Sequence, residues 1–597
     1  MTARTEPNPL DRTMQTPVQN RPSAQARGSD ERGFALIMTV LAVLIVGSLV
    51  AAATILSSNH LLINNYYERE SQLSLIADAG VDLARAALNG VDSIYPDSGY
   101  TILQNGTAVT DASGTTIPGV RRWIYAGPSG VTSGQYGVFG SIIAVVEDQG
   151  GARVIRRSQV YQESFSKYAY FTDIEPSSIW FGGGDQIFGP VHSNSELKLH
   201  STGVTFHGTV RTASTVRNPG NGTFHQGYTE GVPNIPMPST ADLNKLQVQA
   251  TSGNTAIVGD SNGGSGEATT RLEFIAIDLN GDGDTSDDNE GFMRVYQSTN
   301  ADWVTATGNE EASDQCGAYY SGTFVTTNNH PHGGNDAQAA LKTATSRCYL
   351  GGHDSIAGSF RATTDGYGSW LTYPGTVSSL VTATGRADAN YLFPINRALN
   401  PNFKGVIHVT GKVVVSGVIR GRITIAATDD IIIGDDITYV TDPGAGTCVD
   451  IAGYFAGDDV IVADNDLNAP AYVAGTGVDD YYTLDDTSDE FIHGTVLALS
   501  NFTVQNYNSG SNNDEACEGS AWGRGCLYLT GGIIQAQRGA VGLSSGRGYV
   551  KRYSYDQCGA TSPPPYFPTT GVFAKGQYYN VDPSGFNIDT YFALITP

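Results

Sequence analysis

The residues with the clearest spacing for chemistry are acidic and lie in the segment 277–292, IDLNGDGDTSDDNEGF. Oxygen-bearing side chains alternate there around a Gly turn, and such a loop can converge on Ca²⁺, which takes about six or more oxygen ligands. The carboxylate that an EF-hand carries at position twelve comes one residue late, because Asn289 occupies that position. The segment predicts a structural calcium site, with a solvated acidic turn as the alternative. The candidate ligands are Asp278, Asn280, Asp282, Asp284 and Glu290.

The sequence on both sides of this acidic loop favours β-strands. Residues 274–277 read FIAI and residues 293–296 read MRVY, and neither flank carries a helical pattern. We therefore expect the loop to close a hairpin rather than to join two helices.

All six cysteines lie in the second half of the chain, and none forms a C-x-x-C motif, which disfavours a zinc ribbon or a thioredoxin-like site. An even number permits disulfides in an oxidising compartment, with free buried thiols as the alternative. Proximity along the chain suggests two pairs and leaves a third, although the connectivity is not fixed by sequence. These pairs are Cys316–Cys348, Cys517–Cys526 and Cys448–Cys558.

Motifs of catalysis are missing or lie in the wrong context. Residues 542–546, GLSSG, match G-x-S-x-G, but no helical pattern follows, as a nucleophile elbow requires. The chain has no HExxH motif and no P-loop. Lys412 and Arg420 lie between β-branched runs, where basic residues usually face solvent, although in a calcium-bearing solenoid they would suit a polysaccharide lyase. We expect no enzymatic activity.

Length and composition point to several β-rich parts. The chain has 597 residues, with 72 Gly and 31 Tyr, a profile that suits many short strands and turns. Its net charge of −25 disfavours nucleic acid as a partner, because phosphates repel an acidic surface.

Two blocks, 171–215 and 401–545, share short apolar bursts that end at Gly, Asn or Ser. In the second block, DDIII at 429–433 is echoed by DDVIV at 458–462. Short strands without helical interludes predict a β-solenoid-like domain, with a jelly roll or sandwich as the alternative. The two blocks would form one domain, interrupted by an insertion at 216–400 that holds the acidic loop.

The remaining segments flank this domain. A small β region is predicted at 95–170, where the β-branched runs 138–146 and 152–161 favour a hairpin. Residues 546–597 are rich in Pro and aromatic side chains and lack periodicity, so we expect a C-terminal tail that wraps the domain.

The N-terminal segment combines a polar leader, 1–33, with a long apolar run. No Asp, Glu, Lys or Arg occurs between Phe34 and Tyr67, and a helix over 34–57 would be roughly 36 Å long, enough to cross a bilayer. Beyond it, apolar and small residues recur at helical spacing from Leu73 to Leu88, and no Pro interrupts 34–92. A single helix over 34–94 is expected, packed through this stripe on the small β region, with a coiled-coil face for another subunit as the alternative.

This N-terminus resembles that of type IV pilin-like proteins, in which a peptidase cuts before an apolar helix and leaves the helix attached. The resemblance places the cut between Gly33 and Phe34 and implies methylation of the new amine. Major pilins carry Glu as the fifth mature residue, whereas the fifth residue here is Met38. That pattern is similar to minor pilins of the PilX N-terminal type and to the tip pseudopilin of type II secretion.

The resemblance implies a minor pilin or pseudopilin, incorporated at the tip of a type IV pilus-like filament. Its expected partners are prepilin peptidase, other pilin or pseudopilin subunits, and the inner membrane before assembly, with the C-terminal part first periplasmic and then at the cell surface. The alternatives are an adhesin with a solenoid head and, less favoured, a surface-anchored carbohydrate-active enzyme.

Overall fold

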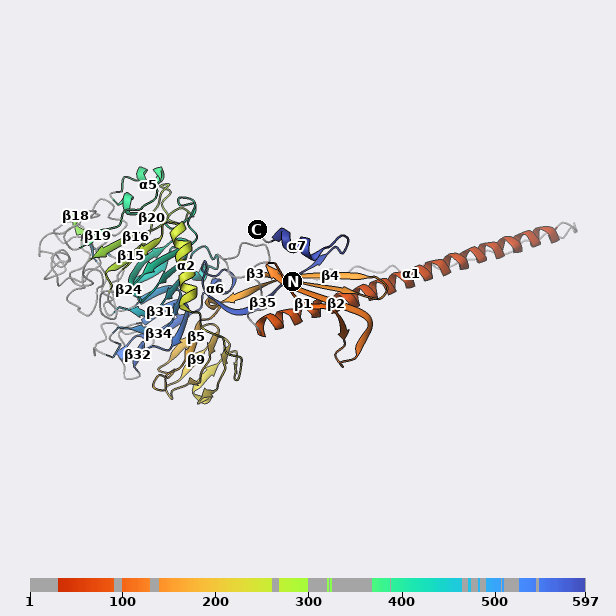
Figure 1. Cartoon of the computed structure of the whole chain (residues 1–597), viewed down its shortest axis with the longest axis horizontal. Helices are drawn as coiled ribbons and strands as arrows, with labels where there is room; N and C mark the ends of the chain where they lie inside the picture. The colour runs from red at the N-terminus through yellow and green to blue at the C-terminus, as the bar shows by residue number, and fades with distance from the viewer. Residues whose placement is uncertain are drawn as a thin grey trace, which may run out of the picture. The chain divides into compact units, whose positions relative to one another are not determined.

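The structure is a computed structural model (Figure 1), in which the chain divides into two units, 1–75 and 76–597. The residues that the structure describes are 31–90, 99–128, 139–259, 268–298, 319–320, 323–324, 368–386, 388–463, 471–473, 481–483, 490–505, 507–508, 526–543 and 547–595.

Helix α1 runs without interruption over Glu31–Gly90, which confirms the single long helix. From Phe34 to Gln72 every side chain is exposed. Beyond Ile76 the stripe predicted from the spacing is buried, because it packs on a sheet, and it consists of Ala77, Val81, Ala84 and Leu88.

The sheet under this part of α1 has five antiparallel strands in the order β1–β2–β3–β4–β35. The predicted hairpin is confirmed as β3 and β4. A Cβ added to Gly80 would lie 2.8 Å from Arg122 Cδ and 3.3 Å from Ala144 Cβ, so this glycine lets the helix approach the sheet closely. Asp78 and Arg156 add an ion pair of 3.1 Å. The strands are β1 (Thr101–Thr110), β2 (Thr116–Pro128), β3 (Phe139–Glu147), β4 (Arg153–Ser164) and β35 (Thr569–Val581).

The expected C-terminal tail is wrong, because residues after 546 form regular structure. Strand β34 (Val550–Ser554) belongs to the large sheet, β35 completes the small sheet, and α7 (Ile588–Ile595) buries Phe592 against it. Two register shifts along β35, where Gly571 and Gly576 lie, break the alternation by which a strand is recognised in sequence.

The rest of the described chain is dominated by one large sheet whose strands pair mainly in parallel. One ladder runs β21–β23–β25–β29–β31–β5–β7–β10–β13, and every pairing in it is parallel. Parallel stacking of successive short strands fits the solenoid-like prediction, whereas a jelly roll or sandwich would pair them antiparallel. The strands are β5 (Tyr170–Ile174), β7 (Val191–Ser193), β10 (Val210–Thr212), β13 (Tyr228–Thr229), β21 (Val406–Thr410), β23 (Arg422–Ala427), β25 (Ile451–Ala456), β29 (Glu490–Ala498) and β31 (Cys526–Gln537).

Further ladders run β22–β24–β26–β30 and β31–β34–β6–β9–β12. The two echoed sequences form neighbouring rungs, because Ile431 on β24 pairs with Val460 on β26. Their inward Val and Ile side chains form one continuous core. These strands are β6 (Asp185–Ile187), β9 (Val204–Phe206), β12 (Gly222–Phe224), β22 (Val413–Ile419), β24 (Ile431–Tyr439), β26 (Val460–Val462) and β30 (Phe502–Val504).

Together these ladders form one stack of strands, and the order of the strands in this stack differs from their order in the sequence. Ile533 on β31 pairs with Tyr170 on β5, so the end of the second block lies on the start of the first. The chain enters the stack in its middle at β5 and runs outward to β13. It then passes through α2 (Thr240–Ser252) to the opposite end, where β14 (Ala256–Val258) pairs with β21, and returns toward the middle.

Helix α2 packs on the outer face of the first ladder, as Figure 1 shows. Its buried residues are Leu243, Leu246 and Ala250, and its first turn is fixed by a capping box between Ser239 and Asp242. The outward side chains beneath it come from successive rungs of both blocks: Phe171, Val406, Ala426, Phe455, Leu497 and Ile534.

The predicted insertion, 216–400, is wrong as a separate part. Strands β12 and β13 continue the first block, and β15 (Thr270–Ala276) pairs in parallel with β22. The antiparallel partner of β15 is β16 (Gly291–Ser298), so the hairpin expected around the acidic loop is confirmed. Alternation and apolar runs identify strands but not their neighbours, and so they could not show that this segment caps the stack.

The other described elements are short. They are β8 (Leu197–Lys198), β11 (Val216–Arg217), β17 (Tyr319–Tyr320), β18 (Thr323–Phe324), β19 (Gly368–Trp370), β20 (Phe393–Pro394), β27 (Ala471–Val473), β28 (Tyr481–Thr483), β32 (Gly542–Leu543), β33 (Arg547–Gly548), α5 (Ser379–Ala383) and α6 (Cys558–Thr561).

Candidate functional site

Gly33 and Phe34, the predicted processing residues, lie in the first turns of α1. Phe34 is exposed, as are the apolar side chains that follow it, Met38 included. Among the described residues, α1 is the one helix long and apolar enough to cross a membrane.

The predicted calcium ligands lie in the turn between β15 and β16. Asp278 accepts hydrogen bonds from the backbone N–H groups of Gly281 at 2.6 Å and Gly283 at 2.9 Å. Glu290 is fully buried, and its two oxygens accept from the N–H groups of Leu279 at 2.8 Å and Asp287 at 3.0 Å. These bonds fold the loop from within.

The other candidate ligands are also joined within the loop. Asn280 Nδ2 donates to Asp282 Oδ2 at 2.8 Å, and Asp282 Oδ1 accepts from the N–H of Asp284 at 3.2 Å. Backbone and side-chain hydrogen bonds from Ser286 lower the pKa of Asp284. The turn is held by hydrogen bonds within the loop, and its carboxylates keep lone pairs that could bind a cation. Calcium binding stays a prediction.

Arg420 anchors the acidic loop to the stack, and the expectation that it faces solvent is wrong. Its side chain is 5% exposed and pairs with Asp450 at 2.8 Å and Asp288 at 3.0 Å. It also donates to the carbonyl oxygens of Asp287, at 3.1 Å, and Ser286. Burial removes Arg420 from contact with any polysaccharide, which weakens the lyase alternative.

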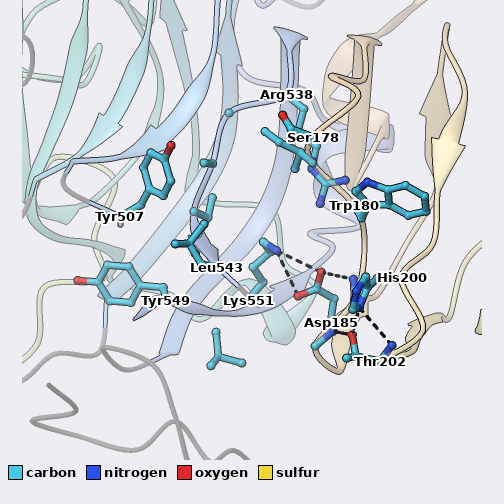
Figure 2. Close-up of a pocket in the computed structure, with 18 residues that line it drawn as sticks. Ser178, Trp180, Asp185, His200, Thr202, Tyr507, Arg538, Leu543, Tyr549 and Lys551 are labelled. Atoms are coloured by element: carbon cyan, nitrogen blue, oxygen red, sulfur yellow. Dashed lines mark hydrogen bonds and ion pairs between the residues drawn. The ribbon is translucent and has the colours of Figure 1, made fainter. Parts of the chain in front are cut away.

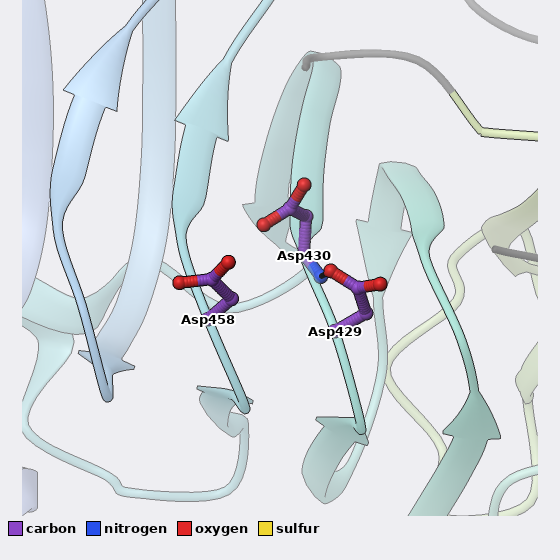
Figure 3. Close-up of side chains that lie close together, drawn as sticks. All are labelled: Asp429, Asp430 and Asp458. Carbon is purple, nitrogen blue, oxygen red and sulfur yellow. Dashed lines mark hydrogen bonds between the residues drawn. The ribbon is translucent and has the colours of Figure 1, made fainter. Parts of the chain in front are cut away.

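The charge of Lys412 is likewise paired within the protein, because its ammonium lies 3.0 Å from Asp430. Asp429, Asp430 and Asp458 form the one group of three acidic, His or Cys side chains in the described chain whose ligand atoms all lie within 4.8 Å (Figure 3). Burial raises the pKa of Asp430, which also accepts a hydrogen bond from the N–H of Asp459 at 3.0 Å. The candidate ligands of the acidic loop do not form such a group.

Cys448 and Cys558 are joined by a disulfide with a Cα–Cα distance of 5.4 Å. It ties the segment before β25 to α6, close to where the chain leaves the large sheet. Cys526 is also disulfide-bonded. Cys316, Cys348 and Cys517 lie outside the described residues.

A pocket of about 470 Å³ opens where β34, from the segment after the second block, pairs with β6 of the first block (Figure 2). Lys551 from β34 points to Asp185 at the start of β6, with Nζ–O distances of 3.1 and 3.3 Å. Asp185 also accepts from the N–H of Gly182 at 3.2 Å. Burial lowers the pKa of Lys551, and the charge of Asp185 acts in the opposite direction.

One wall of the pocket carries Trp180, His200 and Thr202, and Tyr507, Leu543 and Tyr549 lie on the other side (Figure 2). The indole of Trp180 is fixed, because its N–H donates to Ser177 O at 3.2 Å and the guanidinium of Arg217 lies 6.0 Å from the ring centre. His200 Nδ1 and Thr202 Oγ1 are 2.9 Å apart.

Arg538 lines the pocket, and its charge is balanced by Glu175. It is buried, pairs with Glu175 at 3.2 Å, and lies 3.7 Å from the centre of the Phe181 ring. The segment GLSSG contributes Gly542 and Leu543 to the lining through β32, which pairs with β33, while 544–546 lie outside the described residues.

Sequence reasoning missed this pocket, because its lining comes from 178–202 and 507–551, two segments that meet through the reordered stack. Trp180 and the Gly-rich turn after it were the only local sequence features that could have pointed to the pocket, and a Gly-rich turn alone indicates no more than a loop.

No protein-family model matches the chain, and no curated protein matches it in sequence. Three chains among solved structures match. One is the competence-associated pilin ComZ from Thermus thermophilus, which is 13% identical with a TM-score of 0.23, over 85% of this chain and 97% of that chain. At that TM-score the likeness carries no argument.

Proposed function

We propose that the chain is a minor pilin-like subunit of a type IV pilus-like filament. In this proposal prepilin peptidase removes residues 1–33, the amine of Phe34 is methylated, and α1 waits in the inner membrane before it enters the filament. The observation that carries the proposal is α1 itself, one helix whose first half is apolar and exposed and whose second half packs on an antiparallel sheet.

The exposed half of α1 needs an apolar environment. Leu, Ile and Val side chains lie on all its faces, including Leu36, Ile37 and Val40, each more than 50% exposed. A surface helix of a water-soluble domain would instead show one apolar stripe. Lipid before assembly, and the helices of neighbouring subunits after it, would each bury these side chains.

Two features support a position at the filament tip. Met38 stands at the fifth place after the expected cut, so this helix has no carboxylate there to pair with a terminal amine in the filament core. The head, inserted between β4 and β35, is several times larger than the five-stranded sheet that holds it. A head of that size is hard to repeat along a shaft. Both the PilX-type minor pilins and the tip pseudopilin of type II secretion fit this description.

Mass spectrometry of the chain purified from membrane fractions tests the proposal. The expected N-terminus is Phe34 carrying one methyl group. Gly33→Leu should retain residues 1–33, whereas the matched change Gly28→Leu, within the leader, should leave processing unchanged. An intact leader on the unchanged chain in membranes and filaments would overturn the proposal.

A second candidate function, adhesion through the head, is favoured by one observation, the pocket between β6 and β34. A deletion strain with normal piliation but lost attachment would support it. No enzymatic activity is proposed.

A further inference from the structure

The pocket between β6 and β34 is a built site rather than a gap in the packing. Its volume, about 470 Å³, lies within the roughly 300–1,000 Å³ of small-molecule sites, and its lining mixes aromatic rings with a few fixed polar groups, as such sites do. Backbone pairing between β34 and β6 holds it in shape, Arg552 with Gln186 and Tyr553 with Ile187.

The charged side chains that the structure describes at the pocket cancel in pairs. Lys551 is paired with Asp185 at 3.1 Å, and Arg538 with Glu175 at 3.2 Å. An anionic ligand would have to displace a carboxylate from its cation, and a metal ion would find Asp185 as the one carboxylate among the described residues of the lining. The electrostatics therefore favour a neutral ligand.

The polar groups of the pocket both donate and accept hydrogen bonds. The ammonium of Lys551 donates and the carboxylate of Asp185 accepts. His200 Nδ1 accepts from the N–H of Thr202 at 3.3 Å, which leaves Nε2 of the ring as a donor. The Thr202 hydroxyl is already bonded to His200 Nδ1 at 2.9 Å and to the N–H of Gly183 at 2.6 Å. A ligand that satisfies such a set carries several groups that also do both. Hydroxyl groups meet this requirement, and they do so without charge.

The aromatic side chains add flat apolar surfaces. Trp180 and Tyr507 contribute to the lining, whereas Tyr549 borders it but is 2% exposed and belongs to the apolar core. Trp180 is held in place before any ligand arrives. A preorganised ring loses little entropy on binding. The C–H faces of a pyranose ring pack well on aromatic rings, whereas its rim of hydroxyls reaches the polar groups.

We propose that this pocket binds a neutral saccharide, with space for roughly one or two sugar rings. The site goes beyond the filament role and does not depend on it.

Binding is measured with the full-length chain in a zwitterionic detergent, because detergents with sugar head groups would compete. The probes are maltotriose, cellotriose and triacetylchitotriose as neutral saccharides, and trigalacturonate as an acidic one, each titrated by calorimetry and by saturation-transfer NMR. We expect at least one neutral probe to bind and trigalacturonate to bind more weakly.

Two variants change the pocket in opposite ways. Trp180→Ala removes one wall and should weaken binding by about tenfold or more. Ala540→Leu fills the space without removing a contact and should abolish binding while the melting temperature is kept, so it supplies the test even where Trp180→Ala folds poorly. Tyr228→Ala, which removes an exposed aromatic ring on β13 outside the pocket, is the matched control and should bind unchanged.

Three results would each overturn the proposal: no binding by the neutral probes, equal binding by Ala540→Leu, or tighter binding of trigalacturonate. Because the assay needs no filament and no processing, its failure would leave the filament proposal standing. Failure of the mass-spectrometric test would likewise leave the saccharide site standing.

Discussion

Ser164 Oγ donates a hydrogen bond of 3.3 Å to the carbonyl oxygen of Pro568, although 404 positions separate the two residues. The N–H of Phe165 donates to the same oxygen at 3.0 Å. The chain therefore leaves the small sheet at the end of β4 and returns to it at the start of β35 at one point. The entire parallel stack is an insertion into the sheet that packs on α1.

The disulfide at this junction should contribute measurably to stability. Cys448 and Cys558 are 110 positions apart. A disulfide typically stabilises a fold by about 2–4 kcal/mol, and one that closes so long a loop belongs at the upper end of that range. Cys558→Ser should lower the free energy of unfolding by that amount in urea titrations without reductant. Cys448→Ser should give the same loss and the double variant no further loss. Additive losses would contradict a shared bond.

The join between the two blocks can be tested at Gly532 on β31. A Cβ there would lie 2.0 Å from the backbone oxygen of Tyr168, which a side-chain rotation cannot relieve. Gly532→Ala should destabilise the head by about 1–3 kcal/mol or more in thermal unfolding.

Gly220→Ala is the matched control for this change, because a Cβ at Gly220 meets no atom within 4 Å and this glycine has no left-handed φ. If both variants melted alike, the stacking of β31 on β5 would be wrong.

Two residues of the acidic loop, Asp284 and Glu290, should respond differently to substitution. Asp284 is exposed and accepts one backbone bond, from Ser286 at 2.8 Å, so Asp284→Ala should barely change stability without calcium. It should remove most of the stabilisation that calcium gives through preferential binding to the folded chain.

Glu290→Ala should cost about 1–3 kcal/mol even without calcium, because it leaves the N–H groups of Leu279 and Asp287 without their acceptor. Melting temperatures with calcium and with chelator measure both effects. If calcium shifts neither the unchanged chain nor Glu290→Ala, the segment is the acidic turn and not a metal site.

Stability should fall as the pH is lowered below about 6.5, the ordinary pKa of histidine. Burial lowers the pKa of His408, and neither of its ring nitrogens has a hydrogen-bond partner among the described residues. The unfolded chain then binds more protons than the folded one below that pH, so acid favours unfolding. Burial also lowers the pKa of His192 and His493, which adds to the effect.

His408→Leu should show a shallower loss of unfolding free energy between about pH 7.5 and pH 5 than the unchanged chain, by up to about 1.4 kcal/mol per pH unit. Urea titrations across that range measure it. An identical slope would mean that another group carries the acid sensitivity.

Local patterns predicted those elements whose neighbours lie close in sequence. The stripe through Ala77 and Leu88 and the hairpin of β3 and β4 follow from spacing within a few tens of residues. The echo of 429–433 in 458–462 indicated repeated strands, and the structure shows that they pair, Ile431 with Val460. The order of the stack did not follow, because strands of two or three residues carry too little pattern to specify a partner. The pairing of Ile533 with Tyr170 joins segments more than 360 positions apart, and the pocket beside it was hidden for the same reason.

The position of the two crossings between sheet and head also determines how the molecule would bear tension. A pull on a ligand held in the pocket passes from β6 and β34 to the strands beside them, β31 and β5, and leaves through the two adjacent backbones at Ser164 and Pro568. These two backbones share the load side by side. The outer rungs, from β13 at one end to β14 at the other, lie off this path. Tension would therefore act on the two connections at Ser164 and Pro568, and most of the head would bear none of it.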